Sequence, residues 1–414
     1  MNFDKKRSVT KNSFVRNSEA MLNGIFGTTD VTPFWVADMD FPVANPIKEE
    51  LQRLVDRGQF AYEFNSQGVF TAISDWYQRR HDLSLNVDNF VQVTGVLTGI
   101  ALLIRELTDE GDSVLIQTPA YHQFSKVIST ANRNVLKSPL KIVNNNYQMD
   151  FEDMEQKMAA SEVKVMILCN PHNPVGRVWR KEELEQVVQL ANKHHVTIIS
   201  DEIHSDIIYS GHKFTSLMTI DANKHVALIG SPSKTFGMQS ISNGYLYTEN
   251  TKLLASMKAF AESLYIDHGN AFTTFATIAA FEKGEAWLDA FLVYMQGNID
   301  WINDFLWSEL PQVKMFPVEG TYQVWFDFSA TGLAGGELTK VFGKAGFGAS
   351  PGSWFDGDAK HFARMSFASP RSEIKQAFER LKDALEQTAV PASGNNKCES
   401  NKCESNKATS AGCC

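Results

Sequence analysis

The chain contains several short apolar runs, each of which is followed by polar residues. The clearest runs lie at residues 113–117, 163–169, 196–200 and 226–229, and most are rich in valine and isoleucine. Each run is continuous rather than alternating, which is typical of parallel strands buried on both faces. Because helix-like stretches separate the runs, the pattern predicts an α/β fold with a mostly parallel sheet flanked by helices.

The same pattern predicts how the chain divides into domains. Residues 46–284 are expected to form a large cofactor-binding domain around the parallel sheet. Residues 285–390 are expected to form a smaller α/β domain, joined by an N-terminal arm at residues 1–45. Residues 391–414 hold a repeated Asn-Lys-Cys-Glu-Ser unit with few apolar side chains, which predicts a disordered tail.

Composition excludes several classes of protein. With 414 residues, of which 43% are hydrophobic, the chain can bury the cores of two or three domains. A net charge of -9 without a basic stripe predicts no nucleic-acid partner. No apolar stretch reaches about 18 residues, and the basic N-terminus has no apolar segment after it. We therefore expect a cytoplasmic protein with no membrane partner.

The cysteines point to a reducing compartment. Cys169 is the only cysteine before residue 391, and the other four lie in the predicted tail. A disulfide framework is therefore not expected. The spacing of the tail cysteines is not the C-x-x-C of zinc sites, so no metal is expected either.

Polar and aromatic side chains follow the four apolar runs. Tyr121, Asn173 and Asp201 come after the first three runs, His204 follows Asp201 closely, and Lys234 comes after the fourth. Because ligands bind at the carboxyl ends of parallel strands, these residues are expected at one rim of the sheet. Each has an ordinary alternative: a half-buried ring, a turn, a helix cap or a surface lysine. Their occurrence together indicates a site.

This set of side chains has a chemical meaning. A lysine at the edge of a sheet can lose its proton by desolvation and act as an amine nucleophile. A lysine that forms a Schiff base and an aspartate that faces a pyridinium nitrogen are what proteins supply to pyridoxal phosphate. Lys234 and Asp201 therefore predict pyridoxal 5'-phosphate (PLP) as the cofactor.

A cradle for the phosphate group is also predicted. The segment 94–99 follows the apolar run 90–93 and opens a helix-like stretch. Backbone N–H groups at the start of a helix bind anions, so Gly95, Val96 and Leu97 are candidates, with hydroxyls added by Ser231 and Ser233. A plain strand-to-helix turn is the alternative explanation for Gly95.

Over about residues 1–390 the chain resembles the fold-type I PLP-dependent class I/II aminotransferase superfamily. Within it, the chain is most similar to the carbon–sulfur beta-lyase branch, the MalY/PatB-like cystathionine beta-lyases. The segments that carry this resemblance are Phe34–Pro42, Ser200–His204, Gly284–Asp289, Gln296–Asp300, Glu319–Tyr322 and Ala363–Arg371.

The resemblance implies a role for each residue around the cofactor. Lys234 would hold PLP as a Schiff base, and Asp201 would face the pyridine nitrogen. Asn173 would bind the phenolic oxygen, and Tyr121 would stack on the ring. His204 would lie beside the ring, at a position where aminotransferases usually have a tyrosine.

The resemblance also implies how substrate and subunits are arranged. Arg364 would clamp the substrate α-carboxylate, a task that suits the guanidinium fork, and Ala37 would line the substrate site. Tyr62 would reach the phosphate of a neighbouring subunit. The resemblance therefore implies a homodimer with shared active sites and an amino acid as the small-molecule substrate.

The expected reaction is β-elimination from cystathionine, cysteine or related S-conjugates, which gives a thiol, pyruvate and ammonia. The resemblance, and not a physical argument, favours elimination over transamination. The alternative hypothesis, that the protein is an aminotransferase of a small amino acid, therefore stays open. A PLP-binding regulatory protein with little turnover is a third possibility, because a fold alone does not establish chemistry.

Two departures from the family pattern lie after the lysine. Family members usually have Thr-Phe-Asn-x-Ala-Gly there, whereas this chain has Gly237, Gln239 and Ser240 at the positions that differ. Ser242 stands where many aminotransferases carry a phosphate-binding arginine. The first departure puts loop geometry and substrate preference in question. The second agrees with the lyase branch and leaves phosphate affinity to backbone groups and hydroxyls.

Two rival motifs fail. Ser231 and Lys234 match the S-x-x-K pattern of serine acyl enzymes, but the required Ser-Asp-Asn and Lys-Thr-Gly partners are missing. No G-x-G-x-x-G follows an early strand, so a dinucleotide enzyme is not expected.

Overall fold

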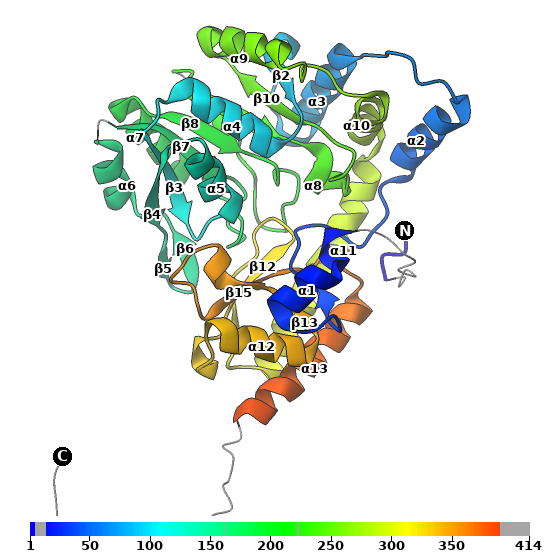
Figure 1. Ribbon diagram of the computed structural model, residues 1–414, viewed down its shortest axis with the longest axis vertical. Helices are drawn as coiled ribbons and strands as arrows, with labels where there is room; N and C mark the ends of the chain where they lie inside the picture. Colours follow the sequence, from blue (N-terminus) through cyan, green and yellow to red (C-terminus); the bar gives the residue numbers. More distant parts are fainter. Residues whose placement is uncertain (5–13, 161, 222, 390–414) are drawn as a thin grey trace, which may run out of the picture.

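A computed structural model describes residues 1–4, 14–160, 162–221 and 223–389 (Figure 1). The predicted tail at residues 391–414 lies outside the described residues. The largest element is a seven-stranded sheet. In spatial order its strands are β2 (Phe90–Val93), β10 (Gly244–Thr248), β9 (Val226–Gly230), β8 (Thr197–Asp201), β7 (Val163–Cys169), β3 (Ser113–Thr118) and β4 (Asn134–Pro139).

The sheet is parallel except for one strand. β4, β3, β7, β8 and β9 pair in parallel, whereas β10 runs antiparallel to both β9 and β2. The four apolar runs of the sequence correspond to β3, β7, β8 and β9, and every residue of β3 and β9 is buried. The prediction of an α/β fold with a mostly parallel sheet is therefore confirmed.

Helices cover both faces of this sheet. Buried side chains of α4, α5 and α9 form one core with the strands, and those of α6 and α7 form another on the opposite face. A Cβ at Gly99 in α4 would overlap the side chain of Ile229, so glycine lets this helix lie close to β9. The helices of this part are α2 (Asn45–Arg57), α3 (Ser66–His81), α4 (Val96–Leu107), α5 (His122–Thr130), α6 (Phe151–Met158), α7 (Lys181–His194), α8 (Pro232–Phe236), α9 (Thr251–Ser263) and α10 (Ala271–Lys283).

A second, antiparallel sheet lies beside the first and has the order β11-β12-β15-β14. Its strands are β11 (Lys314–Met315), β12 (Gln323–Asp327), β15 (Phe362–Ser366) and β14 (Ser350–Pro351). The helices around it are α1 (Glu19–Phe26), α11 (Glu285–Glu309), α12 (Gly335–Ala345) and α13 (Arg371–Ala389).

The remaining elements are short. β1 (Thr32–Pro33) pairs in parallel with β13 (Phe347–Gly348), and β5 (Lys141–Val143) pairs with β6 (Asn146–Gln148). The β1–β13 pair ties the N-terminal segment to the part of the chain that holds the second sheet. The 3-10 helices are η1 (Val15–Asn17), η2 (Val87–Asn89), η3 (Leu217–Thr219), η4 (Ser329–Thr331) and η5 (Gly352–Trp354).

A buried ion-pair network fixes the second sheet against the loop after β7. Glu319, shortly before β12, accepts hydrogen bonds from the Nε of Arg177 at 2.9 Å and from the backbone N–H of Val178 at 2.8 Å. Arg177 also pairs with Glu183 at 3.0 Å. Because all three charged side chains are buried, the chain just before Tyr322 is held firmly against the edge of the large sheet.

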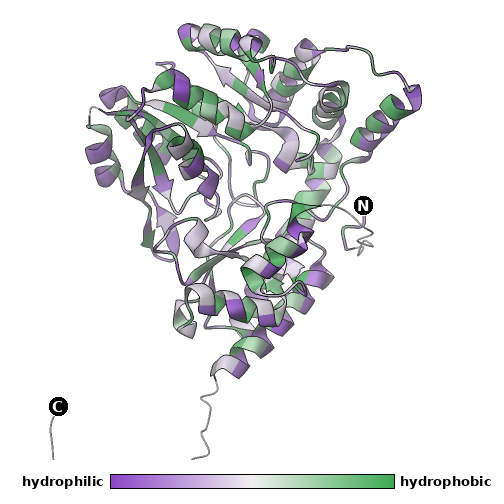
Figure 2. Cartoon of the chain, viewed as in Figure 1, coloured by the Kyte–Doolittle hydropathy of each residue, from purple (hydrophilic) through white to green (hydrophobic). Residues whose placement is uncertain are grey.

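The helices carry hydrophobic and hydrophilic residues side by side, as amphipathic helices do (Figure 2). Among the described residues, no helix is long and apolar enough to cross a membrane. The predicted domain boundaries at residues 46, 285 and 391 stay a prediction.

Candidate active site

A cavity of about 280 Å³ lies at the carboxyl ends of the strands of the large sheet. All predicted site residues except Tyr62 and Arg364 line it. The predicted residues at its wall are Ala37, Gly95, Val96, Leu97, Tyr121, Asn173, Asp201, His204, Ser231, Ser233 and Lys234. Segments that lie far apart in the sequence therefore meet in one cavity.

Lys234 projects into this cavity from the short helix α8. The helix begins after Ser231, whose hydroxyl accepts a hydrogen bond from the N–H of Ser233, and it ends at Gly237, which has a φ of +73°. Lys234 Nζ donates a hydrogen bond to the carbonyl oxygen of Ala37 at 2.5 Å. Burial, reinforced by the nearby charge of Arg364, lowers the pKa of Lys234 from 10.5 to about 8.

Asp201 and His204 lie on the wall next to the lysine. Asp201 is the last residue of β8, and its Oδ1 accepts a hydrogen bond from the N–H of Ile203 at 3.1 Å. Burial raises the pKa of Asp201 to about 7, although Lys234 works in the opposite direction. Burial also lowers the pKa of His204 well below its ordinary value, so its imidazole is neutral.

Arg364, on the second sheet, does not line the cavity but contacts Asn173, a residue of the cavity wall. It lies on β15 and is buried, and its Nη2 donates to the carbonyl oxygen of Trp35 at 2.7 Å. Its Nη1 donates to the Oδ1 of Asn173 at 3.3 Å, and its guanidinium lies 4.7 Å from the ring centre of Phe355. Burial lowers its pKa to about 10, which leaves it charged at neutral pH. Among the described residues, its buried Nε has no hydrogen-bond partner.

Another part of the cavity wall carries backbone N–H groups and hydroxyls. The helix α4 starts after Gly95, and no side chain caps its first turn. Three further hydroxyl residues line the cavity that the sequence analysis did not name as site residues, namely Thr94, Thr98 and Ser242, although the sequence places Ser242 at the position of a phosphate-binding arginine. A helix N-terminus surrounded by hydroxyls suits a phosphate group, so this part of the wall fits the phosphate of PLP.

Several other residues at the site were not predicted. Phe124, Cys169, Ile203 and Gln239 also line the cavity. Gln239 carried a signal in the sequence, because it replaces an alanine of the family pattern. The three others are ordinary apolar or buried side chains, which no sequence pattern marks as part of a site.

Tyr62 does not lie in the cavity of its own chain. It is 98% exposed in the segment between α2 and α3, and its ring centre lies 6.3 Å from that of Phe64. Its predicted contact with the phosphate of a neighbouring subunit stays a prediction.

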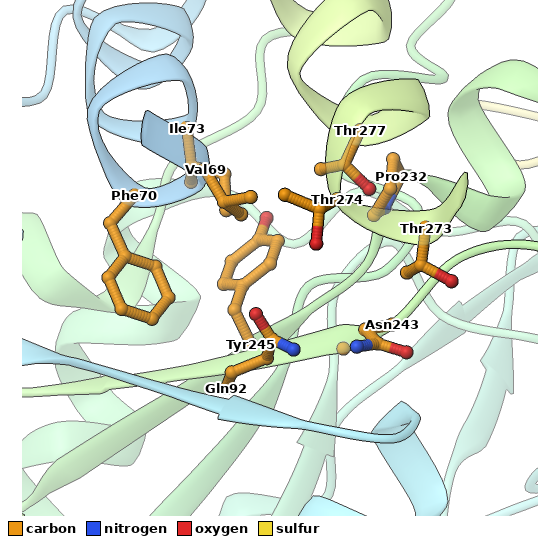
Figure 3. A pocket seen from close by; sticks show the side chains of 11 residues that line it. Val69, Phe70, Ile73, Gln92, Pro232, Asn243, Tyr245, Thr273, Thr274 and Thr277 are labelled. Atoms are coloured by element: carbon orange, nitrogen blue, oxygen red, sulfur yellow. The ribbon is translucent and has the colours of Figure 1, made fainter. Parts of the chain in front are cut away.

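A second cavity lies between β2, β10, α3 and α10 (Figure 3). Its volume is about 10 Å³, which is room for one water molecule and not for a substrate. Gln92, Asn243 and Thr274 supply polar groups around it, so this space belongs to the packing of the helices on the sheet. Among the described residues, no cluster of histidine, cysteine or acidic side chains could hold a metal ion.

Comparison with known proteins agrees with this geometry. Residues 32–381 match the family described as aminotransferase class I and II. Cystathionine beta-lyase PatB of Bacillus subtilis (strain 168) is 34% identical over 93% of this chain and 100% of that protein. Protein MalY of Escherichia coli (strain K12) is 30% identical over 87% of this chain and 93% of that protein.

Solved structures give the same result. The PLP-bound C-S lyase from Staphylococcus hominis superposes with a TM-score of 0.86 and 28% sequence identity, and the match covers 93% of this chain and 98% of that one. The resemblance inferred from the sequence motifs is therefore confirmed. The chain belongs to the aminotransferase class I and II family.

Proposed function

We propose that the protein is a PLP-dependent carbon–sulfur beta-lyase that acts on cystathionine, cysteine or related S-conjugates. The observation that carries the proposal is the single cavity that brings together Lys234, Asp201, Asn173 and the first turn of α4. Relatives with the names cystathionine beta-lyase and C-S lyase support elimination over transamination.

The residues of the cavity fit PLP from end to end. Lys234 would bind its aldehyde carbon, Asp201 would face its ring nitrogen, and Asn173 would donate to its phenolic oxygen. Tyr121 would stack on the ring, and His204 would lie beside it. PLP, when bound, draws electrons away from the substrate's α carbon and so makes the α proton acidic.

The phosphate of PLP would lie against another part of the cavity wall. The N–H groups of Gly95, Val96 and Leu97 and the hydroxyls of Ser231 and Ser233 would hold it. The hydroxyls of Thr94, Thr98 and Ser242 add to this set and replace the arginine that many aminotransferases use. The negative charge is then balanced by hydrogen-bond donors and the helix dipole.

Arg364 and Lys234 carry the remaining steps on the protein side. Arg364, which contacts the wall residue Asn173, would bind the substrate carboxylate, and its Nε has no hydrogen-bond partner among the described residues. Lys234 removes the α proton as a general base, which a pKa of about 8 makes effective near neutral pH. The bond between the β carbon and sulfur then breaks, and the thiolate leaves with the electron pair. The released three-carbon enamine hydrolyses to pyruvate and ammonia.

The assembly is part of the proposal. We propose a homodimer, because the exposed rings of Tyr62 and Phe64 lie together on the surface and the nearby Phe60 is exposed as well. Tyr62 would then complete the phosphate site of the partner subunit. A cytoplasmic location agrees with Cys169 as the one cysteine before the tail.

A product assay with several amino acids tests the proposed reaction. L-cystathionine, L-cysteine and S-substituted cysteines should release pyruvate, ammonia and a thiol in equal amounts, and Lys234→Ala should release none. A keto acid that keeps its sulfur would identify an aminotransferase instead. A yellow protein that reacts with no amino acid would favour the regulatory alternative.

A further inference from the structure

The carbonyl oxygen of Ala37, a residue of the cavity wall, accepts hydrogen bonds from two side chains. Lys234 Nζ donates a hydrogen bond to it at 2.5 Å, and the hydroxyl of Tyr322 donates to the same oxygen at 3.2 Å. The Nε2 of Gln239 donates in turn to the Tyr322 hydroxyl at 3.4 Å. Sequence reasoning assigns no role to Tyr322 or Gln239.

We propose that the Ala37 carbonyl is the resting position of the Lys234 amine whenever that amine is free, and that Tyr322, supported by Gln239, shares this carbonyl with the amine and so weakens its hold on protonated lysine. Tyr322 and Gln239 are positioning residues, because they act on Lys234 through Ala37. In the proposed reaction the substrate's amino group takes the place of the Lys234 amine on the cofactor. The resting position of the released amine then determines from where it approaches the α proton. This use of the amine depends on the proposed function, whereas the resting position does not.

The backbone around Ala37 is held on both sides. The N–H of Phe34 donates to the carbonyl of Gly348 at 2.9 Å, and the N–H of Ser366 donates to the carbonyl of Phe34 at 2.8 Å. On the other side, the hydroxyl of Ser366 donates to the carbonyl of Asp38 at 3.0 Å. The Ala37 oxygen therefore has little freedom to follow the lysine.

Tyr322 is equally constrained. Its side chain is fully buried, and its carbonyl accepts a hydrogen bond from the N–H of Phe367 at 3.0 Å. The preceding residue, Thr321, donates to the carbonyl of Ile207 at 2.9 Å. Burial raises the pKa of Tyr322, so the hydroxyl keeps its proton and stays a donor. Because the Tyr322 hydroxyl and the Ala37 carbonyl are both held in place, the hydrogen bond between them has one geometry.

This arrangement has a predictable effect on the proton of Lys234. A carbonyl that already accepts from Tyr322 is a weaker acceptor for an ammonium group, so removal of the hydroxyl strengthens the hold on protonated lysine. The pKa of Lys234 should therefore rise when Tyr322 is replaced by phenylalanine. The other charged or titratable groups that act on Lys234 are unchanged by this substitution, namely Arg364, Asp38, Asp201 and His204.

The test measures the free amine directly, on full-length protein from which the cofactor has been removed. Brief reductive methylation at a series of pH values, followed by mass spectrometry of the Lys234 peptide, gives the midpoint of amine reactivity. We expect the midpoint of Tyr322→Phe to rise by about half a pH unit, which is about threefold less labelling below the midpoint. Gln239→Ala should shift it in the same direction by less.

Tyr209→Phe is the matched control. Tyr209 is also buried, but its hydroxyl has no hydrogen-bond partner among the described residues, so its loss should leave the midpoint unchanged. Equal midpoints for wild type and Tyr322→Phe, or an equal shift in Tyr209→Phe, would overturn the proposal. If Tyr322→Phe does not fold, Gln239→Ala decides, because its exposed side chain lies outside the core.

A second readout uses the protein with its cofactor restored. The acidic limb of the pH profile of kcat should move upward with Tyr322→Phe while KM changes little. A labelling shift without turnover of any S-conjugate would reject the proposed function and leave the resting position supported. Turnover with an unshifted labelling midpoint would reject the resting position alone.

Discussion

Asp206 anchors the helix that carries Lys234, and its replacement should destabilise the protein strongly. Its buried carboxylate accepts three hydrogen bonds, from Trp76 Nε1 at 2.8 Å, from His81 Nε2 at 3.0 Å and from Thr235 Oγ1 at 2.9 Å. Thr235 directly follows Lys234 on α8. The perturbation to make is Asp206→Asn, which keeps the shape and removes the charge.

The magnitude follows from these three contacts. A hydrogen bond to a charged group contributes about 1.5–3 kcal/mol to stability. Asparagine keeps one acceptor oxygen but turns an NH₂ group toward at least one donor, so part of the network is lost. We expect the free energy of unfolding to fall by about 2–4 kcal/mol.

The dependence on pH has a definite sign. Burial alone would raise the pKa of Asp206. Hydrogen bonds from His81, Trp76 and Thr235, together with the charge of His81, lower it below 3.8 instead. A carboxyl group with a lowered pKa in the folded state stabilises the protein above its unfolded value and loses that effect as pH falls through the folded value. The difference in the free energy of unfolding between wild type and Asp206→Asn should therefore have its full size at neutral pH and decrease only in strong acid.

Urea denaturation of the two proteins at neutral pH measures the difference. Asp75→Asn is the matched control, because Asp75 lies on the same helix as Trp76 and is exposed, so the same charge change should cost less than about 0.5 kcal/mol. A loss below about 1 kcal/mol in Asp206→Asn would refute the role given to this carboxylate.

Three further predictions concern the cavity. A Cβ at Gly244 would lie 2.9 Å from the carbonyl carbon of Gly95, so Gly244→Ala should displace the phosphate cradle and weaken PLP binding, measured by titration of the visible absorbance. Arg364→Lys should lower kcat/KM by about ten- to a hundredfold, because one ammonium cannot replace a bidentate guanidinium. Mixing inactive Lys234→Ala with inactive Tyr62→Phe should restore part of the activity through hybrid dimers, and no recovery after confirmed subunit exchange would contradict shared sites.

The sequence predicted the core of the large sheet because of how that sheet is built. Every residue of β9 is buried, and so is every residue of β7 except Lys164, so both strands appear as nearly continuous apolar runs that end at the rim. The positions of Asn173, Asp201 and Lys234 follow from this, since parallel strands end at the same edge. The opposite direction of β10 could not be predicted, because an apolar pattern does not encode strand direction.

Contacts between segments that lie far apart in the chain could not be predicted from the sequence. Arg364 and Asn173 are 191 positions apart in the sequence, and they meet only because the second sheet packs against the rim of the first. Tyr322 and Asp206 are common residue types whose partners come from other elements, so no local spacing marks them. Resemblance supplied the role of Arg364, and geometry alone supplies those of Tyr322 and Asp206.

The central claim is that Lys234 holds the cofactor at the base of this cavity. The direct measurement is borohydride reduction of the purified yellow protein, followed by digestion and mass spectrometry. We predict that the visible band disappears and that the reduced cofactor is found on the peptide with Lys234. Reduced cofactor on another lysine, or a Lys234→Ala protein that keeps both its visible band and its turnover, would contradict the account.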